Sequence, residues 1–173
     1  NLLGIIYLRE NQPKDSLAMY NKSQEIIERK DYKEFQGKIM LNKGVVFASL
    51  EKYDNALDYY KKAEKIYDKL NIKYYLYLTK YNQIMLGNRM KNNNEKISKE
   101  ITQVLKEIED YPNIELLFIK AKSKIAIQGE YYKEYFLLKS YSIILSCNLY
   151  DEDYMDEFFS LLKEIINLAR NNT

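Results

Sequence analysis

The chain of 173 residues contains no histidine, no tryptophan, a single cysteine, five glycines and two prolines. Histidine is the commonest general base and metal ligand in proteins, so its absence argues against most hydrolases, metalloenzymes and catalytic triads. The few glycines form no GxGxxG or GxxxxGK[ST] motif for binding phosphate. Because no nucleophile–base pair is visible either, we expect a protein that is not an enzyme and needs no metal or cofactor.

Charge and cysteine content indicate where the protein is located and which partners it lacks. The single cysteine, Cys147, excludes an internal disulfide framework and fits a reducing cytoplasm, which is the location we expect. The 27 basic and 25 acidic residues give a net charge of +2. This charge is too small to attract nucleic acid by overall electrostatics, so we expect no direct contact with it. No apolar run reaches the roughly 18 residues of a membrane span, so we expect no membrane partner.

Helical periodicity runs through the whole chain, with apolar residues three and four positions apart. No segment alternates with a period of two for long. We expect about nine helices, which include residues 53–70, 72–89, 112–128, 131–147 and 152–170, with a turn at residues 91–96. The short connections require antiparallel neighbours. The predicted fold class is therefore all-α, a right-handed α-solenoid of about four antiparallel helix hairpins. The last helix, residues 152–170, would cap it or form a homodimer contact.

Part of the sequence occurs twice, forty residues apart. The segment "LNKGVVFASLEKYDNALDYYKKAEKIY", which begins at Leu41, aligns with "NLLGIIYLRENQPKDSLAMYNKSQEII", which begins at Asn1. Gly44 and Ala56 are expected where the two helices of a hairpin approach closely, because a larger side chain would force them apart. Tyr60 and Phe47 are expected to fill the space between successive hairpins.

This pattern of glycine, small and aromatic residues resembles the tetratricopeptide repeat. Its clearest copy is Gly44, Phe47, Ala56, Tyr60 and Ala63, and the preceding copy is Gly4, Tyr7, Ser16, Tyr20 and Ser23. The resemblance is strong over residues 1–70, weaker over 113–145 and degenerate over 71–110. The period of forty exceeds the usual 34 or so residues, which predicts helices about one turn longer. It also suits HEAT-type repeats.

In its long hairpins and its composition, the sequence also resembles the C-terminal sensor domain of peptide-pheromone-responsive regulators of Gram-positive bacteria, the Rap, Rgg, NprR, PlcR and PrgX group. The resemblance implies a tetratricopeptide domain that takes part in quorum sensing and transcriptional regulation by binding a short peptide on its concave face. The chain begins inside a repeat unit, so we expect residues 1–173 to be a single repeat domain from the C-terminal part of a longer protein.

The forty-residue register also predicts the binding face. The rows are Leu2, Asn42 and Asn82, then Ile5, Val45 and Met85, then Arg9, Ser49 and Arg89. Offsets of three, four and seven place the rows on one helical face. The predicted peptide-binding residues are Asn42, Asn82, Val45, Met85, Ser49, Arg9 and Arg89.

Each of these residue types suits an extended peptide. Asn42 and Asn82 can donate to and accept from one peptide unit, the role that groove asparagines have in the pheromone receptors. Apolar neighbours provide side-chain pockets, and Arg9 or Arg89 can clamp a carboxylate. Ordinary alternatives remain: the asparagines could simply face solvent, and the arginines could complement helix dipoles. The alternative function is a structural adaptor that scaffolds a protein complex without a peptide ligand.

Overall fold

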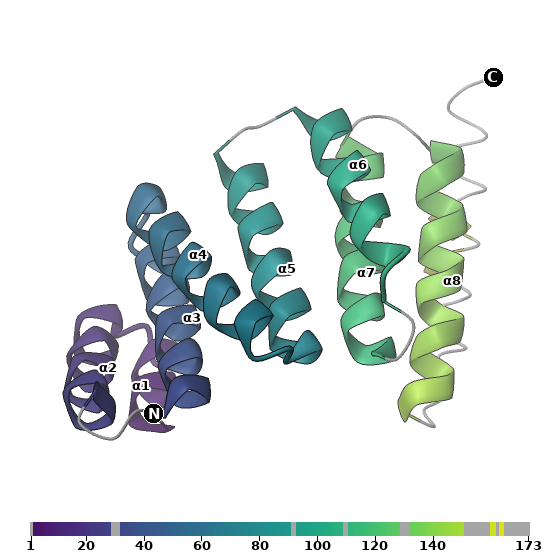
Figure 1. Ribbon diagram of the computed structural model, residues 1–173. Coiled ribbons are helices and arrows are strands. Elements are labelled where there is room, and N and C mark those ends of the chain that lie inside the picture. The colour runs from purple at the N-terminus through teal and green to yellow at the C-terminus, as the bar shows by residue number, and fades with distance from the viewer. Residues whose placement is uncertain are drawn as a thin grey trace. The chain divides into compact units, whose positions relative to one another are not determined.

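The computed structural model (Figure 1) describes residues 2–28, 32–90, 93–108, 111–128, 132–150, 160–161 and 163–164. Within these ranges all regular structure is helical. The helices are α1 (Leu2–Arg9), α2 (Pro13–Glu28), α3 (Lys33–Ser49), α4 (Tyr53–Lys69), α5 (Lys73–Arg89), α6 (Asn94–Leu105), α7 (Pro112–Gln128) and α8 (Tyr132–Tyr150). The prediction of an all-α fold of helix hairpins is confirmed.

The chain divides into two compact units, Asn1–Lys91 and Asn92–Thr173. The first contains α1 to α5 and the second α6 to α8 (Figure 1). Within each unit every helix packs against the helices that precede and follow it in sequence, and in the first unit α3 also contacts α5. Because α3 and α5 begin forty residues apart, this contact brings equivalent positions of the repeat close together.

The forty-residue repeat is visible in the helix boundaries. Helices α2, α3, α4 and α5 begin at residues 13, 33, 53 and 73, which are twenty residues apart. Each of the four is 16 or 17 residues long. Helix α6 begins at residue 94 and has only 12 residues. The regular register therefore ends with α5, which explains why the sequence pattern is degenerate over residues 71–110.

Glycine and tyrosine form close contacts inside the hairpins. The small residues of the repeat pattern predicted such a close approach of the two helices. A Cβ atom added to Gly44 would lie 2.4 Å from the ring of Tyr60, and one added to Gly4 would lie 2.7 Å from the ring of Tyr20. Tyr60 was predicted to fill the space between hairpins, but its ring also packs inside its own hairpin, against Gly44 of α3. Phe47 likewise stacks on Tyr59 of the same hairpin, with 5.2 Å between ring centroids.

Equivalent polar contacts join successive hairpins. The Lys43 ammonium of α3 donates a hydrogen bond to the side-chain oxygen of Gln24 on α2. Forty residues further on, Nε2 of Gln83 on α5 donates to Oε2 of Glu64 on α4 over 2.8 Å. In both cases the donor lies on α3 or α5 and the acceptor on the helix that precedes it in the sequence. The repeat thus preserves the position of this contact although the residue types change.

The turns that follow α1, α3 and α4 share one backbone geometry. Asn11, Glu51 and Asn71 have φ values of 59°, 58° and 53°. At the second turn the amide of Glu51 donates to the carbonyl of Ala48, and the amide of Lys52 donates to that of Phe47. The other two turns repeat this pair of bonds, which defines the Schellman motif. Each of these three helices is therefore followed by a residue in the left-handed conformation, and the next helix begins two residues after it.

Glu51 is the least suited of these residues to a left-handed conformation, which costs roughly 1–2 kcal/mol for a residue that is neither glycine nor asparagine. We expect Glu51→Gly to raise the free energy of unfolding by about 0.5–1 kcal/mol, because part of the relief is offset by the entropy of the unfolded glycine. Urea denaturation measures this change. Asn71→Gly is the matched control and should gain less, since asparagine tolerates this region. A Glu51→Gly protein no more stable than the parent would contradict this account of the turn.

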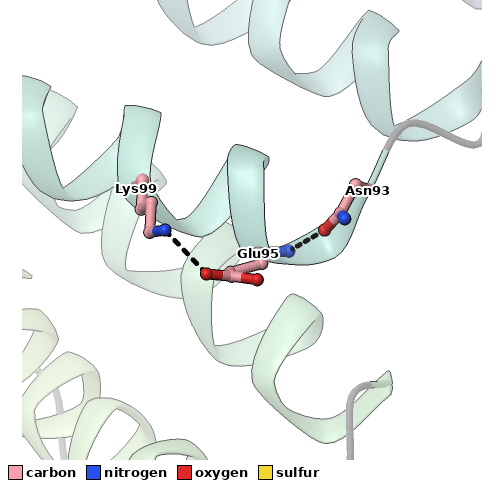
Figure 2. Close-up of polar contacts among 3 residues, drawn as sticks. All are labelled: Asn93, Glu95 and Lys99. Carbon is pink, nitrogen blue, oxygen red and sulfur yellow. Dashed lines mark hydrogen bonds and ion pairs between the residues drawn. The ribbon is translucent and has the colours of Figure 1, made fainter.

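Helix α6 begins earlier than the sequence predicted. Residues 91–96 were expected to form a turn, but α6 starts at Asn94 because the Asn93 side chain caps it, accepting a hydrogen bond from the Glu95 amide over 2.7 Å. Figure 2 shows this cap and the adjacent ion pair between Lys99 and Glu95, 2.6 Å long. Lys96 pairs with Glu100 over 3.9 Å. These lysines thus belong to mixed-sign pairs on an exposed surface.

The capping helix predicted at residues 152–170 lies largely outside the described residues. At its described positions Leu161 is buried, and Glu164 contacts α8. The Tyr135 hydroxyl of α8 donates to the Glu164 carboxylate over 2.9 Å. Burial, with this hydrogen bond, raises the pKa of Tyr135 to about 12. The contact places residue 164 beside the first turn of α8.

Candidate functional site

A cavity of about 250 Å³ lies in the first unit, where α3 and α5 meet. Its apolar lining consists of Leu8, Val45, Ala48, Met85 and Leu86. Its polar lining consists of Ser49, Tyr60, Asn82 and Arg89. We call this cavity the α3–α5 pocket. Its mixture of aliphatic, amide, hydroxyl and guanidinium groups is the mixture that an extended peptide can use.

The structure brings five of the seven predicted binding residues together in this pocket. They are Val45, Ser49, Asn82, Met85 and Arg89. The reason is the repeat itself, because α3 and α5 begin forty residues apart and lie side by side. Equivalent positions on the two helices, such as Val45 and Met85, therefore face the same space. That these residues bind a peptide stays a prediction.

Two predicted residues are absent from the pocket lining. Arg9 is exposed in the last turn of α1, and its neighbour Leu8 lines the pocket instead. Leu8 corresponds to Ala48 in the forty-residue register, and both line the pocket, so α1 contributes through the row next to that of Arg9. Asn42 is half-buried on α3, one turn before Val45 on the same face. It lies beyond the edge of the pocket.

The two central polar groups are held in place by their own helices. The Asn82 side-chain nitrogen donates to the carbonyl of Leu78 over 2.9 Å. This bond uses one of two amide hydrogens and leaves the other, together with the side-chain oxygen, for a ligand. The Ser49 hydroxyl donates to the carbonyl of Val46 over 2.7 Å, so its oxygen can still accept a hydrogen bond. Both groups are thus oriented before a ligand arrives.

Sequence reasoning missed Tyr60, Leu8, Ala48 and Leu86. Tyr60 matches the aromatic position of the repeat pattern and was therefore assigned to packing alone. The other three are apolar residues whose periodicity indicates burial, and periodicity does not distinguish the wall of a pocket from a filled core. No signal in the sequence alone would have identified them.

Other kinds of site find no support in the part of the chain that the structure describes. No group of three or more cysteine, aspartate or glutamate side chains there could hold a metal ion. None of the described helices is both long enough and apolar enough to cross a membrane.

Comparison with known protein families supports the repeat assignment. The family described as Tetratricopeptide repeat matches residues 1–69, which contain α1 to α4. Such repeats generally mediate protein–protein or peptide interactions and are typically non-catalytic scaffolds. The chain matches none of the curated proteins with which it was compared. The matched segment provides Val45, Ser49 and Tyr60, while the α5 wall of the pocket lies beyond it.

Proposed function

We propose that this chain is a peptide-binding module whose site is the α3–α5 pocket. The observation that carries the proposal is the meeting of Ser49, Asn82 and Arg89 with aliphatic side chains in one cavity. An extended peptide presents a hydrogen-bond donor and an acceptor in each unit, which one amide side chain can satisfy together. Its side chains need apolar contacts, which Val45 and Met85 offer.

The ligand's length decides whether Asn42 takes part. Asn42 and Ser49 are seven residues apart on α3, which corresponds to about 10 Å along a helix. About three residues of an extended peptide span that distance. A peptide longer than this would leave the pocket and pass Asn42, whereas a shorter one would contact only the pocket. A role for Arg9, which is exposed on α1, would likewise require a longer ligand.

The wider role that we propose is ligand sensing within a cytoplasmic transcriptional regulator. Its support is the resemblance to the pheromone-responsive group. Binding across several hairpins would favour one arrangement of the repeats over another and so shift a population of conformations. The attached domain or a homodimer contact would read that shift. A structural adaptor without a small ligand is the competing function.

Calorimetry with short peptides of increasing length tests the proposal. We expect Asn82→Ala to weaken binding about tenfold, because it removes two ligand hydrogen bonds of roughly 0.5–1.5 kcal/mol each. Asn42→Ala should weaken binding only for peptides longer than about three residues. Asn55→Ala, at an exposed position of α4, is the matched control and should change nothing.

The outcomes separate the alternatives. Binding that survives Asn82→Ala unchanged would remove the α3–α5 pocket as the site. Failure of every peptide to bind the parent protein would favour the adaptor function. An effect of Asn42→Ala that did not depend on peptide length would contradict the proposed path of the ligand.

A further inference from the structure

Tyr60 packs against α3 and also lines the α3–α5 pocket. It is 2% exposed, and one edge of its ring packs on Gly44, where an added Cβ would lie within 3.1 Å of three ring carbons. The residue also lines the α3–α5 pocket. Because the ring is fixed against α3, the hydroxyl is the polar part left to face the cavity.

The Tyr60 hydroxyl has no hydrogen-bond partner in the described part of the chain. It is not among the enclosed side-chain atoms that lack a partner, so it is open to the cavity, where water or a ligand can accept its hydrogen bond. Tyr67 provides the contrast. Its hydroxyl is also without a partner among the described residues, but it is enclosed, and Tyr67 does not line the α3–α5 pocket.

The electrostatics of the pocket select the kind of partner. Arg89 is a cation in the lining, and none of the described residues that line the pocket is acidic. Its charge reaches the phenol of Tyr60, since it acts to lower the pKa of Tyr60. A cation and a hydroxyl donor in one pocket suit an acceptor that carries negative charge, and a carboxylate is the group of a peptide that provides it.

We propose that Tyr60 contacts the ligand directly, its hydroxyl donating a hydrogen bond to a carboxylate that Arg89 also binds. The carboxylate belongs either to the peptide's C-terminus or to an aspartate or glutamate side chain. This inference rests on the peptide-binding function proposed above. It gives a binding role to a residue that the repeat pattern presents as a packing residue.

The protonation state of Tyr60 agrees with a donor role. Burial raises the pKa of the phenol to about 12, against the opposing effect of Arg89. The hydroxyl therefore keeps its hydrogen at neutral pH and does not compete with the ligand as an anion. Arginine is always charged under these conditions, so donor and cation are present together.

Tyr60→Phe tests the inference, since it removes the hydroxyl and keeps the ring that packs on Gly44. The probes are three pools of random heptapeptides: one with a free C-terminal carboxylate, one amidated, and one amidated and lacking aspartate and glutamate. We expect Tyr60→Phe to weaken binding of the first pool tenfold or more, as for loss of a charge-assisted hydrogen bond. Tyr20→Phe, the equivalent change in the preceding repeat, is the matched control. Tyr20 packs on Gly4 but does not line the pocket, so binding should not change.

The three pools identify the source of the carboxylate. Loss of binding on amidation assigns it to the C-terminus, and loss only in the third pool assigns it to an acidic side chain. Equal binding of all three pools would overturn the inference, as would a Tyr60→Phe protein that binds like the parent while Asn82→Ala binds weakly. In the last case peptide binding at the pocket would stand without Tyr60. If no pool binds the parent protein, both proposals fail.

Discussion

Replacing Gly44 with alanine is expected to lower the free energy of unfolding by about 2–3 kcal/mol, the upper part of the range for overpacked interiors. The added methyl group would lie 2.4 Å from the Tyr60 ring, far inside van der Waals contact. Tyr60 is almost completely buried, so its ring can retreat only toward the α3–α5 pocket that it lines. The helices must therefore separate or the ring must leave its position, although alanine itself favours a helix more than glycine does.

A double-mutant cycle with Tyr60→Ala assigns the cost of Gly44→Ala to this one contact. Tyr60→Ala alone should cost about 3–5 kcal/mol, because it leaves a large cavity. In that background Gly44→Ala should be neutral or stabilising, which corresponds to a coupling energy of about 2–3 kcal/mol between the two positions. Urea denaturation provides all four values, and Asn55→Ala on the exposed face of α4 serves as the surface control. Additive effects would mean that the methyl group meets something other than the Tyr60 ring.

Alkaline pH is expected to destabilise the protein steeply above pH 10. Burial raises the pKa of Tyr60 to about 12. It also raises the pKa of Tyr67, with Tyr75 and Glu34 acting in the same direction. Below pH 10 both phenols are protonated in the folded and the unfolded chain, so their contribution does not change. Above pH 10 the unfolded chain releases protons that the folded chain retains, so the free energy of unfolding falls. Each phenol accounts for up to about 1.4 kcal/mol per pH unit.

Tyr60→Phe combined with Tyr67→Phe measures this contribution. Between pH 10.5 and 12 we expect the parent protein to lose about 2–3 kcal/mol per pH unit through the two phenols, and the variant to lose correspondingly less. At pH 7 the variant should be at least as stable as the parent, because the Tyr67 hydroxyl is enclosed without a partner and its removal relieves a desolvation penalty. Tyr32→Phe is the control, since Tyr32 is 53% exposed. Parallel loss of stability in parent and variant would show that other groups cause the alkaline unfolding.

The sequence by itself determined most of the described helices, the pairing of α1 with α2 and of α3 with α4, and the positions that repeat. Local chemistry explains this success. The forty-residue period of Gly4 and Gly44, with Tyr20 and Tyr60, encodes a steric fit that only small and aromatic residues satisfy, and the structure places each pair in contact. The start of α6 was missed because the asparagines at residues 92, 93 and 94 are all competent caps. Only the backbone shows that Asn93 provides the bond.

Tertiary structure decided which side chains share the pocket. A register states which residues are equivalent, but it does not state how far each helix is rotated about its axis. Leu8, and not Arg9, is the residue of α1 that lines the pocket, and the edge of the cavity falls between Asn42 and Val45. Tyr60 shows the same limit most clearly. Its pattern predicts a packed ring, which is correct, whereas Tyr60 shares a pocket with Arg89 only because α4 packs against α5. Periodicity reports that a residue is buried, and the packing of helices distant in sequence determines which atom of that residue a ligand can reach.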